Sequence, residues 1–423
     1  MPQMILFGIG VATALARGRG RAIAVLLLVL AALSTAQAQA QTWTEADVLT
    51  MAFQGAPDVR IAEGRITQAE ALAEAAGLYP DPQLSWDREA VATGPGSSQD
   101  VVALTVPVDL SGRRSAQQAL AQGRSALREA EAIDVRSRIA AAALMAFYDG
   151  IAADERVEVA LRAVAALDEA VRVISAREAH GTAAGMDQMR VTLEVELARS
   201  ALATSEIAAK LARARLLVLL GRPVDDEPTL EGTLAVSVLP DLGALLDEAE
   251  EQPTLASRRR ARELASDATS SAANAWIPPL LLTGGVNLER ETNTEVGYVA
   301  GVSFLLPFFS QGRAVSAAAR GQSAVAEAQL DARTRRARAA VVAAHLRLVG
   351  LSAEANRFDV ETRGSLEGLL VAANSGYREG RRSLVELLDA RRAAIAVALR
   401  RVNLRLEARR AEIALRNATG ALR

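Results

Sequence analysis

The chain turns back on itself at Tyr377-Arg378-Glu379-Gly380-Arg381-Arg382-Ser383-Leu384-Val385-Glu386-Leu387-Leu388-Asp389-Ala390, which lies between two long segments rich in alanine, arginine, glutamate and leucine. Neither segment contains proline, so we interpret Gly380 as the turn of a very long helical hairpin. Glu386 and Asp389 are three positions apart, and a helix therefore places both carboxylates on one face near the turn. In a symmetric ring of chains this face becomes a ring of acid, whereas in an isolated hairpin it is an ordinary solvated end.

The composition is that of a large folded protein. The chain has 423 residues, of which 50% are hydrophobic and 23% are charged, enough for a sizeable core. Its formal net charge of -2 differs from the basic surface of nucleic-acid-binding proteins, so no nucleic-acid partner is expected. The sequence contains no cysteine, which excludes disulfides, thiolate metal sites and thiol nucleophiles.

Residues 1–40 have the pattern of a cleaved signal peptide. Three arginines, a twelve-residue apolar run and two small-x-small motifs follow one another: Arg17, Arg19 and Arg21, then residues 22–33, then Ala36-Gln37-Ala38 and Ala38-Gln39-Ala40. The alternative is a membrane anchor, but twelve apolar residues are few for crossing a bilayer. We expect export, cleavage near Gln41 and no lipidation, because no cysteine follows the leader.

The rest of the chain repeats one pattern twice. Helical segments that open at Pro57 and Pro253 each lead into a region with strand character. Several landmarks then recur at a nearly constant offset: Pro107, Gly112 and Arg113 return 200 positions later as Pro307, Gly312 and Arg313, while Gly181 with Gly380 and Gly221 with Gly420 are 199 apart. This agreement indicates a duplication, with a first repeat at 41–222, a linker of little regular structure at 223–252 and a second repeat at 253–423.

Each repeat is expected to contain a helix of about twenty residues, two strands and a long helical hairpin. The long helices are predicted at 113–179 and 313–378, and each spans roughly 100 Å at 1.5 Å per residue. The return helices are predicted at 183–220 and 382–419. Abundant alanine allows neighbouring helices to approach closely, as in coiled coils.

The strand regions alternate apolar and polar residues. In residues 296–304 the apolar positions share one face: Val296, Tyr298, Ala300, Val302 and Phe304. Strands of about ten residues with one apolar face are typical of transmembrane barrels, although a soluble sandwich shows the same alternation. Four strands cannot close a barrel alone, and lipid forbids open edges, so three chains sharing their strands would give a barrel of twelve.

The layout resembles the TolC-type outer-membrane efflux channels, the outer membrane factor family. Four motifs carry the resemblance: Tyr79-Pro80-Asp81-Pro82-Gln83-Leu84 before the first strand, Gly112-Arg113 and Gly312-Arg313 after the strands, and the tip Tyr-x-x-Gly-x-Arg followed by Glu-x-x-Asp-Ala. The resemblance implies a mainly α fold with a transmembrane β part. Duplicated long helical hairpins would form an α-barrel, and four strands per protomer would contribute to a trimeric 12-strand β-barrel.

The same resemblance implies a function. It describes a passive homotrimeric duct across the periplasm and the outer-membrane lipid, working in a tripartite pump with a periplasmic adaptor (membrane fusion protein) and an inner-membrane transporter, of the RND type. Small substrates, metal cations or drugs, would be exported. The Pro-Asp-Pro motif and the missing lipid anchor are more similar to the heavy-metal-cation branch than to the drug branch. A type I protein-secretion duct and a non-conducting periplasmic coiled-coil scaffold remain alternatives.

The resemblance also assigns roles to the hairpin tips. Tyr377 and Arg382 match an aperture latch that bonds to a neighbouring hairpin, and Asp187 matches its acidic partner. Glu386 and Asp389 match an acidic constriction that favours cations. Adaptor docking is expected at residues of the two tips: Gly181, Gly185, Gly380, Ser383 and Leu384.

Enzyme chemistry is not expected. His180 and His345 are isolated from each other and from other ligands, so the sequence predicts no metal centre, no cofactor and no catalytic residue. No glycine-rich phosphate loop precedes a helix with the lysine that such a site requires. Energy for transport would have to come from a partner.

Overall fold

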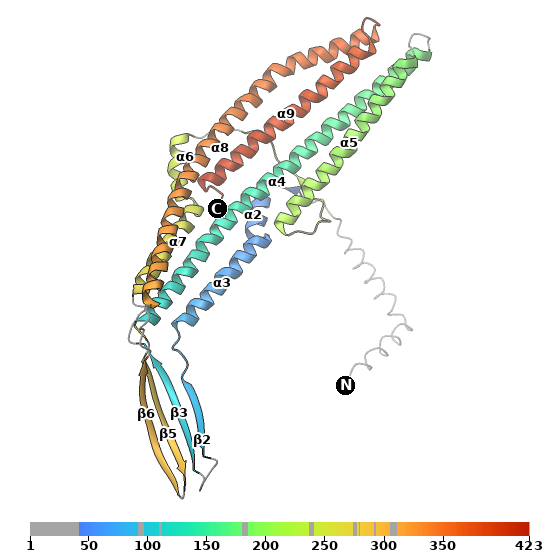
Figure 1. Ribbon diagram of the computed structural model, residues 1–423. Helices are drawn as coiled ribbons and strands as arrows, with labels where there is room; N and C mark the ends of the chain where they lie inside the picture. The colour runs from blue at the N-terminus through green and yellow to red at the C-terminus, as the bar shows by residue number, and fades with distance from the viewer. Residues whose placement is uncertain are drawn as a thin grey trace, which may run out of the picture.

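The computed structural model describes residues 42–91, 97–109, 112–179, 185–236, 241–273, 277–278, 280–291, 293–304 and 311–422. The molecule is elongated, with four long strands at one end and two helical hairpins reaching to the other (Figure 1). The predicted signal peptide at residues 1–40, and Gly181 at the first hairpin tip, lie outside the described residues.

The secondary structure elements occur twice in nearly the same order. The first half contains β1 (Thr42–Trp43), α2 (Glu45–Gly55), α3 (Pro57–Gly77), β2 (Gln83–Ala90), β3 (Ser98–Val108), α4 (Arg113–Ala179) and α5 (Gly185–Leu220). The second contains β4 (Thr229–Leu230), α6 (Leu242–Glu248), η2 (Ala249–Glu251), α7 (Pro253–Ala273), β5 (Leu280–Arg290), β6 (Thr294–Phe304), α8 (Gln311–Arg378) and α9 (Leu384–Thr419). The long helices α4 and α8 have 67 and 68 residues, and the return helices α5 and α9 have 36 each, which confirms the predicted hairpins.

Glycines end the helices where the duplicated pattern places them. Gly221, Gly380 and Gly420 have φ angles of 67°, 72° and 79°, the left-handed conformation that only glycine adopts without strain. After Gly420, the amide of Ala421 donates to the carbonyl of Arg416 at 2.8 Å, which closes the last turn of α9 in a Schellman motif. The predicted turn at Gly380 is confirmed.

We expect Gly420→Ala to lower the free energy of unfolding by about 1–3 kcal/mol, because the left-handed backbone disfavours a Cβ atom. The added Cβ would also lie 2.9 Å from Pro253 Cδ and 3.1 Å from Gln252 Cα. The measurement is the thermal unfolding midpoint by circular dichroism. Gly64→Ala, in the interior of α3, is the matched control. A Cβ atom added at Gly64 would meet no atom within 4 Å. It should raise stability by up to about 1 kcal/mol, and equal midpoints for the two variants would contradict the argument.

The interval between the two halves is more regular than the sequence analysis expects. Strand β4 pairs in parallel with β1, with Trp43 opposite Leu230. Helix α6 begins after Asp241, whose carboxylate accepts from the amide of Gly243 at 3.0 Å. Leu245 of α6 is buried in a cluster with residues of α8 and α9. The expectation of a linker with little regular structure is therefore wrong for this part, because capping and tertiary packing stabilise a helix of only seven residues.

Among the described residues, three hydrophobic clusters hold the long helices together. The largest lies midway along the molecule around Phe147, where α2, α4, α5 and α9 meet. A second joins α4, α5, α8 and α9 near the hairpin tips. The third packs α6 and η2 against α8 and α9. Because α4 packs against both α5 and α9, the two hairpins of one chain lie side by side, while α5 and α8 form the outer edges.

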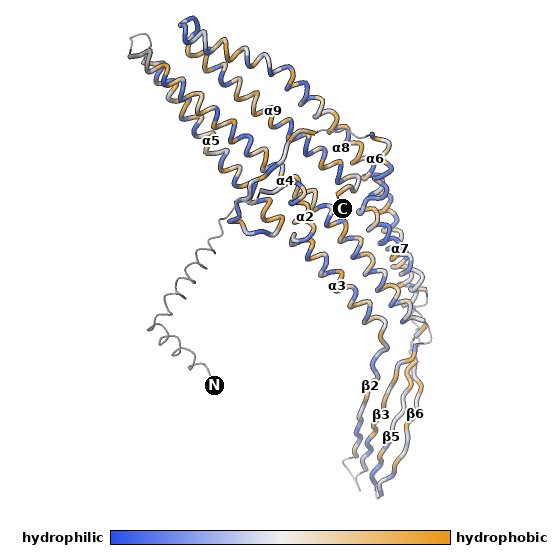
Figure 2. The backbone as a smooth tube through the Cα atoms, turned by 180° about the vertical axis from the view of Figure 1, so that it is seen from behind, coloured by the Kyte–Doolittle hydropathy of each residue, from blue (hydrophilic) through white to orange (hydrophobic). Residues whose placement is uncertain are grey.

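The four long strands form one antiparallel sheet in the order β2-β3-β5-β6. The exposed large apolar side chains of the sheet share one face, as the alternation predicts: Leu84, Trp86, Leu104, Val106, Leu282, Val286, Val296, Tyr298, Val302 and Phe304. The hydroxyls of Thr105 and Thr283 lie 2.9 Å apart on the opposite face. Figure 2 shows the resulting mixture of apolar and polar residues along the strands. Among the described residues, no helix combines the length and apolar character needed to cross a membrane.

Candidate functional site

The tip of the second hairpin is built by two helix ends. Helix α8 ends at Arg378, Gly380 turns the chain, and Ser383 caps the start of α9. The Ser383 hydroxyl accepts from the amide of Glu386 at 3.3 Å, and the amide of Ser383 donates to the Glu386 carboxylate at 2.8 Å. This reciprocal capping box delays the start of α9 to Leu384, two residues later than predicted.

The two predicted acidic residues share the exposed face of α9. Glu386 and Asp389 are both exposed, while Leu384, Leu387 and Leu388 are buried on the opposite side. Hydrogen bonds from the Ser383 backbone and hydroxyl, together with the charge of Arg382, lower the pKa of Glu386 below its ordinary value. The carboxylate at this tip therefore stays ionised at neutral pH.

Of the predicted latch residues, Arg382 pairs within its own hairpin. Arg382 Nη1 donates to Glu386 Oε1 of its own helix at 2.9 Å. Tyr377 is only 4% exposed and belongs to the tip cluster. Asp187 lies in the first turn of α5, on the other hairpin. In the part of the chain that the structure describes, Asp187 makes no ion pair with Arg382, so a contact across subunits stays a prediction.

The position of Leu384 differs from the one expected for a docking residue. Its side chain is 2% exposed and packs in the tip cluster, whereas Ser383 and Gly380 are exposed. The reason is the amphipathic register of α9, which turns Leu384 into the tip cluster. A partner at this tip would contact Gly380 and Ser383 rather than the side chain of Leu384.

Sequence reasoning missed an ion pair that joins the two hairpins. Arg392 of α9 bonds both Asp389, at 3.1 Å, and Glu194 of α5. Glu194 is 198 positions away in the chain, so no local pattern predicts the contact. The capping box, in contrast, has a visible signal in the spacing Ser-x-x-Glu at Ser383 and Glu386.

A second polar network, also missed, fixes the middle of the molecule. The hydroxyl of Tyr148 donates to Glu45, and Arg416 Nη1 donates to the same carboxylate at 2.6 Å. Arg409 lies 4.8 Å from the centre of the Tyr148 ring and donates to the carbonyl of Thr233 at 2.9 Å. Burial and the bond to Glu45 raise the pKa of Tyr148. Burial favours a raised pKa for Glu45, but its hydrogen bonds outweigh this and lower it.

Both halves of the chain match one family. Residues 48–222 and 245–421 match the sequence model of the family described as outer membrane efflux protein. The chain belongs to this family. The resemblance indicated by the sequence motifs is thereby confirmed. The repeated match also follows the duplicated order of helices and strands.

Two relatives of this chain are metal-resistance proteins. The cobalt-zinc-cadmium resistance protein CzcC of Cupriavidus metallidurans is 26% identical over 258 residues, which are 60% of this chain and 59% of that protein. The nickel-cobalt-cadmium resistance protein NccC of Alcaligenes xylosoxydans xylosoxydans is 25% identical over 290 residues, or 67% of this chain and 65% of that protein. The matched region thus spans about three fifths to two thirds of these relatives.

Solved channel structures confirm the fold. The outer membrane channel CmeC of Campylobacter jejuni superposes with a TM-score of 0.77 at 15% identity, covering 89% of this chain and 85% of that one. CusC, a transmembrane channel, gives 0.75 at 16% identity, over 89% and 92% of the two chains. The outer-membrane channel OprN gives 0.74 at 19%, over 89% of each chain. The mainly helical fold with a four-stranded sheet is therefore that of an outer-membrane channel.

Proposed function

We propose that this protein is a passive trimeric duct that carries metal cations across the periplasm and the outer membrane. In this proposal a periplasmic adaptor and an inner-membrane transporter of the RND type deliver the cargo. The single observation that carries the choice of cargo is the pair of metal-resistance relatives, CzcC and NccC. Family membership supports the channel itself.

Unpartnered edges support the assembly of several chains into a ring. Helix α5 carries an exposed apolar row along its free side: Leu193, Leu197, Ile207, Leu211 and Val218. These positions follow the 3.5-residue period of a coiled-coil seam. Helix α8, at the other edge, exposes Leu346, Val360 and Val371. Strands β2 and β6 end the sheet on either side. Two different edges fit head-to-tail closure by rotation, which creates a ring without a free edge.

The sheet fits a membrane wall once the ring is closed. Its exposed apolar face would contact lipid, and its opposite face, with Thr105 and Thr283, would line the duct. Sharing strands among three chains satisfies the edges that lipid would otherwise leave unpaired.

The acidic tips fit a cation entrance. Glu386 and Asp389 of three chains would place six carboxylates around the opening, and rings of acid favour cations. The lowered pKa of Glu386 keeps its charge under mildly acidic conditions as well. Adaptor docking at Gly185, Gly380 and Ser383 belongs to the same proposal.

We expect Arg382→Ala or Asp187→Ala to increase the resting conductance of the channel in a planar lipid bilayer. Each substitution removes one partner of the proposed bond between neighbouring hairpins, and an exposed Arg-carboxylate bond is easily released. Arg381→Ala is the control, because Arg381 lies at the same tip but pairs with Glu379. If the conductance is unchanged in both latch variants, the latch is ruled out. The proposal that the protein is a duct would not be affected by that result.

The function is tested by growth of a deletion strain, with and without the gene restored. The strain is grown on graded zinc, cobalt, cadmium, nickel, copper and silver, alongside dyes, detergents and antibiotics. Sensitivity confined to metals supports a cation-efflux duct. Sensitivity to drugs and dyes alone would contradict the metal cargo, and loss of a secreted protein without either sensitivity would favour protein export.

A further inference from the structure

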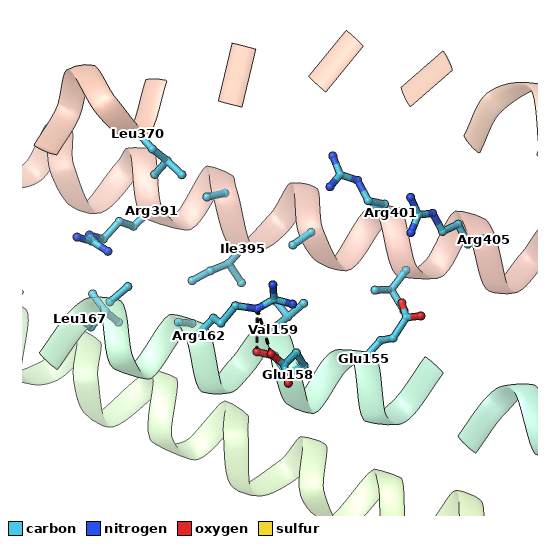
Figure 3. Close-up of a pocket in the computed structure, with 15 residues that line it drawn as sticks. Glu155, Glu158, Val159, Arg162, Leu167, Leu370, Arg391, Ile395, Arg401 and Arg405 are labelled. Carbon is cyan, nitrogen blue, oxygen red and sulfur yellow. Dashed lines mark hydrogen bonds and ion pairs between the residues drawn. The ribbon is translucent and has the colours of Figure 1, made fainter. Parts of the chain in front are cut away.

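A cleft opens between the two hairpins and runs from the cluster near the tips to the central cluster around Phe147. It has a volume of about 490 Å³, a size typical of small-molecule sites, and lies between α4 and α9, with Leu370 of α8 at one end. Its floor is apolar and includes Val159, Leu167 and Ile395. Figure 3 shows charged side chains around this floor, with Arg391 at one end and Glu155 and Arg405 at the other.

Three of the four arginines that line the cleft have acidic partners. Arg401 lies 2.6 Å from Asp359 of α8, and Arg405 pairs with the same carboxylate. Arg162 lies 3.7 Å from Glu158, one turn away on α4. These three cations are therefore wholly or partly neutralised by the chain itself.

Arg391 is different. Its Nη2 donates to Asn374 Oδ1 at 3.0 Å, while its Nε is buried without a hydrogen-bond partner. In the described part of the chain, no carboxylate lies within ion-pair distance of it. Leu167 and Leu370 lie on either side of its guanidinium (Figure 3). Burial lowers the pKa of Arg391, and the charge of Arg378 adds to this effect while Glu169 opposes it. A guanidinium nevertheless stays charged at neutral pH, so the cleft ends in a half-buried cation with an unused donor.

We propose that this cleft binds an amphiphilic organic anion, whose carboxylate or sulfonate pairs with Arg391 while its apolar body packs against Val159, Leu167 and Ile395. The anion would pair with the charged guanidinium of Arg391, which lines the cleft, and a charge-assisted bond gains strength between apolar side chains. The bound molecule would touch α4 and α9 together. It would therefore tie the two hairpins of one chain to each other.

The position of the cleft distinguishes a soluble ligand from a membrane lipid. Residues 155–167 of α4 lie 42 to 54 positions beyond Arg113, where α4 leaves the strands. At 1.5 Å per residue this is roughly 60 to 80 Å from the sheet. A lipid held in a bilayer around the strands cannot reach that far, so the ligand must arrive in solution.

The test uses the full protein, purified in a neutral detergent, and measures binding by equilibrium dialysis and by the shift in thermal unfolding midpoint. Octanoate is the probe. Two comparison molecules differ from octanoate in one property each. Octylammonium carries the opposite charge, and propionate lacks most of the apolar chain. We expect saturable binding of one octanoate per chain, with both comparison molecules at least tenfold weaker.

Three variants and one matched control locate the site. Arg391→Gln should weaken octanoate binding at least tenfold, because a buried hydrogen bond to a charged group is lost. Arg391→Lys, which keeps the charge, should retain part of the affinity. Arg400→Gln is the control, since Arg400 is exposed on the same helix outside the cleft. Ala166→Phe should fill the cleft and block binding. This variant tests the site if Arg391→Gln fails to fold.

Three outcomes would overturn the proposal. They are the absence of saturable octanoate binding, equal binding of octylammonium or propionate, and equal losses in Arg391→Gln and Arg400→Gln. The proposal does not depend on the efflux cargo, because binding is measured on the isolated protein. Failure here would leave the growth and conductance experiments unaffected.

Discussion

A chain carrying both Leu197→Glu and Ile207→Glu is expected to remain monomeric and to lose efflux. The two side chains are 65% and 66% exposed on the free side of α5, in the row that we assign to the seam with α8 of a neighbour. In a closed ring, the two glutamates would bury unpaired charges at every one of these seams. Burial of unpaired charge is costly enough to prevent assembly of an interface whose core is apolar.

The oligomeric state is measured by light scattering after size-exclusion chromatography in detergent, together with resistance of the assembly to unheated dodecyl sulfate. Val224→Glu is the control, because Val224 is 60% exposed but lies after α5 ends. It should assemble as the wild type does. A stable trimer formed by the double variant would show that α5 is not at the seam, and another edge would then have to close the ring.

Much of the fold is predictable from the sequence because its signals are local. Glycine at a helix end and proline at a helix start act through their own backbones, so Gly420 and Pro253 mark boundaries without knowledge of the partners. Strand faces follow from a period of two, which correctly places Tyr298 and its neighbours on one side. The short helix α6 is less predictable, because its stability comes from the Asp241 cap and from packing of Leu245 on distant helices.

The candidate site also has some features that the sequence predicts and others that it does not. The shared face of Glu386 and Asp389 follows from a spacing of three on one helix. The link to the other hairpin does not, because Arg392, which pairs with Asp389 one turn away, also bonds Glu194 of the distant helix α5. Tyr377 illustrates the limit further, since its position at a tip suggests exposure while tertiary packing buries it.

A charge introduced on the apolar face of the sheet is expected to have the second large effect. Five rows of residues, from Phe304 to Val296 along β6, span roughly 27 Å at about 3.4 Å per residue, close to the height of the lipid-facing band in membrane barrels. Ala300 occupies the middle row, opposite Gly284. Ala300→Arg should therefore place a cation at the centre of the bilayer and cost about 2–4 kcal/mol in each chain.

The expected result is loss of the heat-modifiable assembly from the outer-membrane fraction, measured by fractionation and unheated gel electrophoresis. Val299→Arg is the matched control, one residue away on the opposite face. Val299 pairs with Gly285, on the face of the sheet that carries Thr105 and Thr283. It should insert normally, because a charge facing the duct remains in water. If both variants insert equally well, the apolar face does not contact lipid, and the sheet would have to be buried against protein instead.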